Sequence, residues 1–523
     1  MNPNHGDFHG GCLRRALPVF TRRRVLQDTL KVAAGALLSG CNSITTSTPT
    51  AAPVTQAAPT SFPSQQPTPS GPVTSSSLTV NATAAGFIGP AFAGLSYDKA
   101  TLYESPRLFT GASSDLIGLF QLIGPSVLRI GVSSNNGTIW NPNGNGQTSG
   151  EIAPSDVDAL AAFVKATGWQ CLYGINLGGW PTGATTPALA AAEIAYVVQQ
   201  FGASLLGIEI GNEPDANASV TNSGYSNLSQ FIALWEQYRA AILATTPGVS
   251  FTGPACSYNW AQWTIPFGQA VTRNDITLLT QHYYRGDGTS PTSTAQLLLT
   301  PDSYLTGAML PGMRAGAQSI GVPYRMSECN NYYDGGVPGV SNTYVSSLWV
   351  LDFLFECAQA YAAGVNMHGG GNSTPYTPIA DSLGSVIEAR PEFYGVLLFT
   401  LAGQGTLYAT KLAAAGLNVS AFAVKSATGG INVIVVNKDQ TQNLQLTTQL
   451  PQTVNSATLL EMTQLSPGAS GPDLAATEGV MIQGAYVNID GSFSPFPAFP
   501  LSSSGSQVTC YVPALSAVLL QIT

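Results

Sequence analysis

Charged side chains are scarce in this sequence. Only 9% of its 523 residues are Asp, Glu, Lys or Arg, and 19 Lys and Arg residues leave a formal net charge of −9. A surface that binds nucleic acid or an anionic membrane needs clustered positive charge. The composition therefore argues against both partners and favours a neutral, hydroxyl-bearing ligand.

Histidine and paired cysteine are also in short supply. Of the four histidines, only His282 and His368 lie beyond the first 41 residues, which weakens any zinc-site or Ser-His-Asp hypothesis. Five cysteines follow the same segment, an odd number in which no pair has metal-ligand spacing. We expect buried free thiols, with at most one or two disulfides, at Cys171, Cys256, Cys329, Cys357 and Cys510.

Residues 1–41 predict an export signal. Thr21–Leu26 resembles a twin-arginine motif, and the apolar run that follows, Val32–Leu38, is too short to span a bilayer. The sequence Leu38-Ser39-Gly40-Cys41 resembles a lipobox, which predicts lipidation of Cys41 and stable membrane anchoring. The alternative is an ordinary signal peptide with Cys41 incidental. Both interpretations place the protein in the periplasm or at the cell surface. If Cys41 is lipidated, the lipid would be its one link to a membrane.

Residues 42–77 predict a linker. Most of them are Ser, Thr or Pro and none is charged. A segment of this composition cannot bury enough apolar surface to form a core. We expect it to tether the rest of the chain.

Residues 78–401 show a strand-helix rhythm that predicts a (β/α)8 TIM barrel, an α/β fold. Helical periodicity marks stretches such as 156–167, 188–201, 228–245 and 344–363. A doubly wound sheet is the alternative, but no Gly-rich phosphate turn follows an early strand. The eight expected strands are Ala91–Tyr97, Val127–Val132, Gln170–Asn176, Leu205–Gly211, Ser250–Pro254, Ile276–Tyr283, Val322–Ser327 and Gly364–His368.

Residues 402–523 predict an antiparallel β-sandwich, because short strand-like runs alternate with turn residues and no strong helical pattern occurs. Residues 78–90 either open the barrel or join this domain, since Leu78–Thr83 has the pattern of a strand. The expected strands are Leu417–Lys425, Ile431–Asn437, Leu444–Leu450, Ala457–Met462 and Val508–Thr523.

Two acidic residues follow expected barrel strands in similar settings. Asn212-Glu213-Pro214 ends the fourth strand, and Glu328 ends the seventh, before a polar loop. Functional side chains of TIM barrels gather at this carboxyl end of the strands. An exposed charge or a helix cap would explain either residue alone, but the pair across one barrel mouth suits glycoside hydrolysis, which needs a proton donor and a nucleophile or base.

These motifs resemble those of clan A retaining glycosidases, and within the clan the sequence is most similar to glycoside hydrolase family 79, the β-glucuronidase and heparanase family. The resemblance runs from about Leu78 to the end of the chain. It is closest to bacterial exo-β-glucuronidases. The motifs that carry it are Gly94–Asp98, Leu128–Gly131, Gly211–Pro214, Gln281–Tyr284 and Ser327–Asn330.

The resemblance implies roles for particular residues. Glu213 would be the general acid/base and Glu328 the nucleophile, while Asn212 would bind the sugar 2-OH. Tyr283 would orient the Glu328 carboxylate, with an ordinary aromatic on a strand as the alternative. Arg129 would support Glu328, with a buried structural arginine as the alternative. Asp98 would accept hydrogen bonds from sugar hydroxyls, with a helix N-cap as the alternative.

A uronic acid carboxylate would be held without a strong cation. Two consecutive glycines let main-chain N–H groups approach an anion, and tyrosine hydroxyls can complete such a site. A plain surface turn is the alternative. The matching positions are Tyr333, Gly335, Gly336 and Tyr376.

The sequence thus predicts a monomeric exo-β-glucuronidase that removes terminal β-linked glucuronic acid, with or without a 4-O-methyl group, by double displacement. The scarcity of Lys and Arg argues against internal cleavage of heparan sulfate. No metal or organic cofactor is implied. Another clan A β-glycosidase, such as a xylosidase, glucosidase or endoglucanase, and a non-catalytic carbohydrate-binding protein stay open as alternatives.

Overall fold

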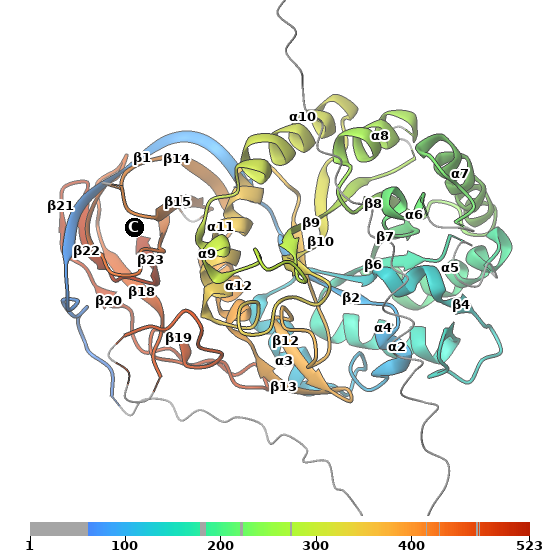
Figure 1. The fold of residues 1–523 in the computed structure, drawn as a ribbon, viewed down its shortest axis with the longest axis horizontal. Helices are drawn as coiled ribbons and strands as arrows, with labels where there is room; N and C mark the ends of the chain where they lie inside the picture. Colours follow the sequence, from blue (N-terminus) through green and yellow to red (C-terminus); the bar gives the residue numbers. More distant parts are fainter. Residues whose placement is uncertain are drawn as a thin grey trace, which may run out of the picture. The chain divides into compact units, whose positions relative to one another are not determined.

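A computed structural model describes residues 61–523, apart from 178–184, 220–222, 272–274, 415, 428, 467–468 and 470. Its centre is a closed barrel of eight parallel strands with helices outside (Figure 1). All eight expected strands form it, so the predicted TIM barrel is confirmed. In barrel order the strands are β10 (Tyr324–Tyr333), β11 (Val365–Gly369), β2 (Ala93–Asp98), β3 (Val127–Gly131), β6 (Gln170–Ile175), β7 (Leu205–Ile210), β8 (Phe251–Cys256) and β9 (Leu278–Asp287).

Helices connect these strands and bury an apolar face against them. In α5, for example, Ala190, Ile194 and Val197 are buried at helical spacing. The connecting helices are α3 (Ser114–Ile123), α4 (Pro154–Thr167), α5 (Pro187–Phe201), α7 (Leu228–Thr245), α8 (Ile265–Val271), α10 (Leu310–Ile320) and α11 (Tyr344–Gln359), and α12 (Pro391–Leu401) follows the last barrel strand.

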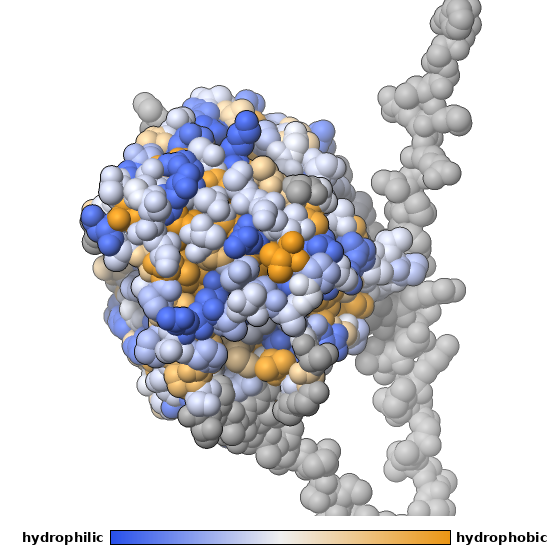
Figure 2. All heavy atoms as spheres, turned by 90° about the vertical axis from the view of Figure 1, so that its left-hand side faces the viewer, coloured by the Kyte–Doolittle hydropathy of each residue, from blue (hydrophilic) through white to orange (hydrophobic). Residues whose placement is uncertain are grey.

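The second domain is a curled, mostly antiparallel sheet, as predicted for the C-terminal part of the chain. Its order is β19-β18-β23-β16-β15-β14-β1-β17-β22-β21, with β20 paired to β18. Figure 2 views its outer side, where small hydrophobic patches lie among hydrophilic residues. The strands are β1 (Val73–Ile88), β14 (Gly405–Ala413), β15 (Val419–Ser426), β16 (Ile431–Asn437), β17 (Asn443–Gln449), β18 (Ala457–Gln464), β19 (Val480–Ile482), β20 (Phe499–Pro500), β21 (Ser503–Ser504), β22 (Gln507–Val512) and β23 (Ser516–Ile522).

The central strands of this sheet are buried on both faces. In β16, Val433 and Val435 join the interior core of the curled sheet, whereas Ile434 and Val436 join the core shared with the barrel. Alternate residues of a strand point to opposite faces. Burial on both faces explains why Val433–Val436 of β16 are all apolar. The face that carries Ile434 and Val436 packs the sheet against the barrel layer that contains α11.

Strand β1 belongs to the second domain, although it precedes the barrel in sequence. It pairs with β14 in antiparallel and with β17 in parallel fashion. It begins at Val73, inside the range expected for the linker. Upstream, Phe62 stacks on Phe496 with ring centroids 5.1 Å apart, and Gln66 exchanges hydrogen bonds with the backbone of Tyr511. The last part of the expected linker is therefore packed onto the domain.

The expected export signal, with Cys41, lies outside the described residues. All five cysteines beyond it are buried free thiols, as predicted. No helix among the described residues is long and apolar enough to cross a membrane.

Candidate active site

Glu213 sits three residues after β7, in an unusual backbone conformation. Its φ of 46° and ψ of 55° lie in the left-handed region, which a residue with a Cβ adopts only when its surroundings compensate. The Glu213 N–H donates to the Ala255 carbonyl at 2.9 Å. Pro214 then opens the short helix α6 (Pro214–Asn217). The turn holds the Glu213 carboxyl group at the barrel mouth.

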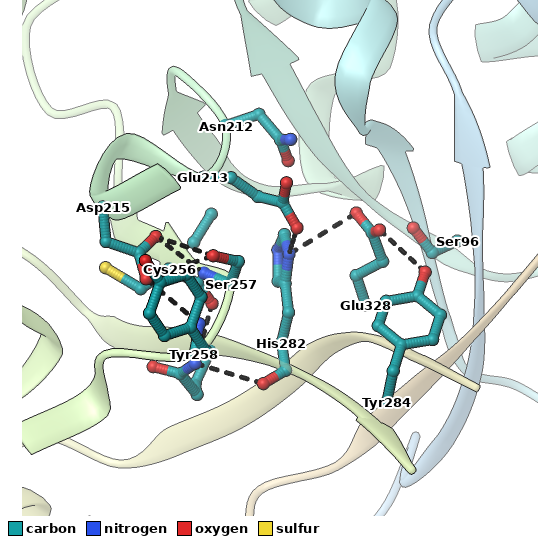
Figure 3. Close-up of polar contacts among 12 residues, drawn as sticks. Ser96, Asn212, Glu213, Asp215, Cys256, Ser257, Tyr258, His282, Tyr284 and Glu328 are labelled. Atoms are coloured by element: carbon teal, nitrogen blue, oxygen red, sulfur yellow. Dashed lines mark hydrogen bonds and ion pairs between the residues drawn. The ribbon is translucent and has the colours of Figure 1, made fainter. Parts of the chain in front are cut away.

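Asp215 ties this turn to the loop after β8. Its carboxylate accepts hydrogen bonds from the backbone N–H groups of Ser257, Tyr258 and Asn259, at 2.8 to 3.0 Å, and from the Ser257 hydroxyl. Figure 3 shows these contacts on the Glu213 side of His282. Two neighbouring loops of the mouth are thereby held as one unit.

Glu328 lies within β10, at a local irregularity of the barrel. The pairing of β10 with β9 shifts register between Met326 and Glu328. Such an irregularity re-aims a side chain, and these features occur next to active sites. Here it accompanies a Glu328 carboxylate that is only 5% exposed and faces Glu213 across His282 (Figure 3).

Two donors hold the Glu328 carboxylate. The Tyr284 hydroxyl donates to Oε1 at 2.9 Å, and Arg129 Nη1 donates to Oε2 at 2.8 Å. Burial opposes ionisation of Glu328, but the nearby His282, His368 and Arg129 and the Tyr284 hydrogen bond outweigh it and lower its pKa to about 2. An ionised, fixed carboxylate is what a nucleophile requires.

Arg129, on β3, organises the floor of the mouth. Besides Glu328, its guanidinium donates to Glu209 Oε2 at 2.6 Å and to Asn212 Oδ1 at 2.7 Å. Its side chain is fully buried. One planar cation therefore fixes the nucleophile candidate and the amide beside Glu213 in one geometry.

His282 lies between the two carboxylates. Its Nδ1 is 3.2 Å from Glu213 Oε1 and 3.6 Å from Glu328 Oε2. One oxygen of each carboxylate and this nitrogen all lie within 4.8 Å of one another, so the three side chains could hold a metal ion. Arg129 already donates to the same Glu328 oxygen, and its charge would repel a cation there. The arrangement therefore suits proton transfer and nucleophilic attack better than metal binding.

Tyr283 does not orient Glu328, so that expectation was wrong. Adjacent residues of β9 point to opposite sides of the barrel wall. Tyr284 faces the mouth, whereas Tyr283 faces outward, stacks on Phe353 of α11 with ring centroids 5.1 Å apart, and donates to Asp302. The expected role falls to the neighbouring tyrosine.

The positions expected to hold a carboxylate come together beside Glu328. The ring of Tyr284, which donates to Glu328, lies 6.1 Å from the Tyr376 ring and 6.2 Å from the Tyr333 ring. Burial and the Glu328 charge raise the pKa of Tyr376, so its hydroxyl keeps its proton and can donate. The Tyr376 N–H donates to the Gly335 carbonyl. The loop after β10 and the segment after β11 thus form one wall.

The glycines in this wall are required by the backbone. Gly335 and Gly336 have φ values of +85° and +90°, and a Cβ at Gly336 would lie 2.8 Å from the Ser341 hydroxyl oxygen. Among the described residues, neither glycine N–H donates to a protein acceptor. Both are available to an anion. Asp334, the acidic residue beside them, is exposed.

Asp98 lies at the end of β2 and accepts a hydrogen bond from the Ser134 N–H at 2.9 Å. The helix that follows, α2 (Thr101–Glu104), has no side-chain cap, so the N-cap alternative is wrong. Its sugar-binding role stays a prediction.

Arg129 contacts Glu328, as one of its two sequence-based interpretations expected. Two further residues of the site, His282 and Tyr284, occur in the sequence motifs without a predicted contact, because strand phase decides which side chains reach the carboxylates. Glu209 is fully buried within β7, and nothing in the local sequence marks it as part of the site. Only its contact with Arg129 does so.

Comparison with known proteins gives two similar curated relatives. A β-glucuronidase of Aspergillus niger is 24% identical over 339 residues, which span 57% of this chain and 61% of that protein. A β-glucuronidase of Neurospora crassa is 25% identical over 277 residues, or 47% of each chain. The chain is a homologue of these β-glucuronidases. These relatives agree with the resemblance carried by the sequence motifs, and no family model matches the chain.

Solved structures with the same fold cover 86% of the chain. A 4-O-α-L-rhamnosyl-β-D-glucuronidase of Fusarium oxysporum aligns over 99% of its length with a TM-score of 0.68 and 18% identity. An α-L-arabinofuranosidase of Thermotoga maritima aligns over 99% of its length with a TM-score of 0.62 and 13% identity. At these identities the similarity establishes the barrel with its β domain. The matched region spans less than two thirds of either curated relative.

Proposed function

We propose that this protein is a retaining exo-β-glucuronidase that hydrolyses terminal β-linked glucuronic acid, with or without a 4-O-methyl group. The observation that carries the proposal is the pair Glu213 and Glu328, with carboxylate oxygens within 4.8 Å of each other. Carboxyl groups about 5–5.5 Å apart act by retention, whereas inverting enzymes need a wider gap for a water molecule. The similarity to two β-glucuronidases supports glucuronic acid as the sugar that is released.

In the first step, Glu213 donates a proton to the glycosidic oxygen while a Glu328 oxygen bonds to the anomeric carbon, and the C–O bond to the aglycone breaks. In the second step, Glu213 takes a proton from water. The resulting hydroxide bonds to the anomeric carbon, and Glu328 leaves as a carboxylate. Glu213 suits both steps because its side chain is 19% exposed. The water molecule that returns a proton to it in the second step can therefore reach it.

The glucuronate carboxylate would lie against Tyr333, Gly335, Gly336 and Tyr376. Two unpaired N–H groups and a protonated Tyr376 hydroxyl can donate to it without a cation. Asn212, which Arg129 holds through its Oδ1, keeps its amide N–H groups for the sugar 2-OH.

The test is hydrolysis of p-nitrophenyl β-D-glucuronide against the glucoside, galactoside and xyloside, with the first-formed anomer followed by proton NMR. We expect preference for the glucuronide, a β-anomeric first product and loss of activity in Glu328→Gln. Glu236→Gln, which changes a partly exposed carboxylate paired with Arg239 on α7, is the control. Preference for a neutral sugar would refute glucuronic acid as the sugar that is released, and an active Glu328→Gln enzyme would refute the mechanism.

A further inference from the structure

Three aromatic side chains at the barrel mouth have no part in the proposed chemistry. Tyr258 is 60% exposed and Tyr304 is 51% exposed, and both rank among the few large hydrophobic side chains on the described surface. Trp260 is partly buried, and its Nε1–H donates to the Tyr304 hydroxyl at 3.2 Å. We refer to Tyr258, Trp260 and Tyr304 as the rim aromatics.

The rim aromatics follow strands on the Glu213 side of the mouth. Tyr258 follows β8, which is next to β7 in the barrel, and Tyr304 follows β9. The proposed glucuronate wall follows β10 and β11, and β8 lies four strands from β2, which ends at Asp98. Because Glu213 protonates the oxygen of the leaving group, the aglycone lies on the Glu213 side, where Asp215 ties the Tyr258 loop to the Glu213 turn.

The rim aromatics are held in place. Asp215 accepts the N–H groups of Tyr258 and Asn259 and thus couples this loop to the Glu213 turn. The Trp260 ring packs so closely on α10 that a Cβ at Gly312 would lie 2.2 Å from it. An exposed aromatic group with a fixed backbone loses little conformational freedom on binding a ligand.

The chemistry of this rim suits a neutral sugar ring. Residues 256–264 carry no charged side chain, and Arg285, which lies near Tyr304, is already paired with Asp302 at 3.2 Å. A second uronate or a sulfated sugar would therefore meet no unpaired cation at these positions. The C–H face of a pyranose ring packs on aromatic faces, while its hydroxyls reach polar neighbours such as Asn259 and Gln262. An exposed tyrosine with polar neighbours offers an aromatic face for the ring and hydrogen-bonding groups for its hydroxyls.

We propose that the rim aromatics bind a neutral sugar ring on the aglycone side of the scissile bond, so that the substrate is a glucuronic acid-capped neutral oligosaccharide. This inference rests on the proposed glucuronidase activity and names its aglycone.

The experiment compares two kinds of substrate. β-D-Glucuronyl fluoride carries no aglycone ring, whereas synthetic trisaccharides place β-D-glucuronic acid on lactose, cellobiose or xylobiose. Values of kcat/KM are measured for wild type, Tyr258→Ala and Tyr304→Ala, with Tyr361→Ala as control, since Tyr361 is an exposed tyrosine that packs on Arg314 instead. Tyr304→Phe tests the ring without the hydroxyl.

We expect the ratio of trisaccharide to fluoride kcat/KM to fall about tenfold in Tyr258→Ala and several-fold in Tyr304→Ala. Tyr304→Phe and Tyr361→Ala should keep the wild-type ratio within about twofold. An unchanged ratio in Tyr258→Ala, or an equal fall for both substrates, would overturn the inference, as would failure of the wild type to cleave any trisaccharide. Failure to cleave the fluoride would instead refute the glucuronidase activity itself.

Discussion

At the scale of single residues, the site depends on which of two adjacent tyrosines faces the mouth. Tyr284 donates to Glu328, and Tyr283 donates to Asp302 outside the barrel. We expect Tyr284→Phe to lower kcat roughly a hundredfold, because the lost donor stabilises the carboxylate that leaves in the second step. Tyr283→Phe is the matched control, and equal losses in both variants would contradict this assignment. Steady-state kinetics with the aryl glucuronide measure the difference.

The pH dependence of the reaction follows from the same contacts. The folded protein lowers the pKa of Glu328 to about 2, so this carboxylate, the proposed nucleophile, is ionised throughout the mildly acidic range and loses its charge only as the pH falls toward 2. Removal of the Tyr284 hydroxyl takes away a hydrogen bond to the ionised form and raises this pKa. In the pH profile of kcat/KM, measured with a substrate whose leaving group does not titrate, the fall on the acidic side should therefore move to higher pH in Tyr284→Phe. A fall at the wild-type position would show that Tyr284 does not stabilise the ionised form.

The sequence singled out Glu213 and Glu328 because each follows an apolar run, and the structure brings the two side chains together at the barrel mouth. It did not place Glu328 correctly along its strand, since β10 continues to Tyr333, and it did not resolve strand phase. The strand that carries Tyr283 and Tyr284 is buried on both sides, so its residues show no inside-outside polarity from which the phase can be read. The contact between Arg129 and Glu209 joins residues 80 positions apart, and no local pattern reports it.

At the scale of elements, the loops after β7 and β8 act as one unit through Asp215. Asp215→Ala removes the acceptor of three backbone N–H groups. We expect a loss of about 1–3 kcal/mol in unfolding free energy and a fall in kcat of at least tenfold, because the Glu213 turn is no longer fixed. Denaturant unfolding and kinetics measure the two effects.

Asp158→Ala is the control for this variant, since Asp158 is an exposed acceptor of the Tyr196 hydroxyl on the helical layer. Retention of full kcat in Asp215→Ala would show that the turn keeps its conformation by itself.

The order of elements was predictable because parallel barrel strands are continuous apolar runs with helices between them. The β domain was harder. The run Val508–Thr523 was expected as one strand, but Pro513 lacks the N–H that a ladder needs, and the structure divides the run into β22 and β23. Strand β14 was missed because its residues are mostly half exposed and offer little apolar contrast.

At the scale of the whole molecule, a partly buried carboxyl group lies where the two domains meet. Burial and the neighbouring Asp352 raise the pKa of Glu356, on α11, to about 8, although Lys438 of the β domain opposes the shift. Glu356 of the folded protein therefore stays protonated at pH values at which the unfolded chain has released its proton. The folded state binds more protons between about pH 4 and 8, so its stability falls as the pH rises through that range.

Glu356→Gln removes this titration while keeping a neutral side chain of the same size. We expect the variant to gain about 1–2 kcal/mol over wild type at pH 8, after allowance for partial solvent screening, and nothing at pH 4. Urea unfolding at both pH values tests this, with the exposed Glu104→Gln as control. A constant difference across the range would show that Glu356 does not titrate in the folded protein.

The pairing of β1 with β17, and of Gln66 with Tyr511 across 445 positions of sequence, has a consequence for how the chain is made. During synthesis the first strand emerges long before its partners, and the barrel residues follow it. The second domain can close only after β17 and β22 have been synthesised. Until then β1 and β14 present open edges that invite wrong pairing. The sheet is thus completed by strands that are far apart in sequence, and a chain that lacks β1 or β22 leaves it open.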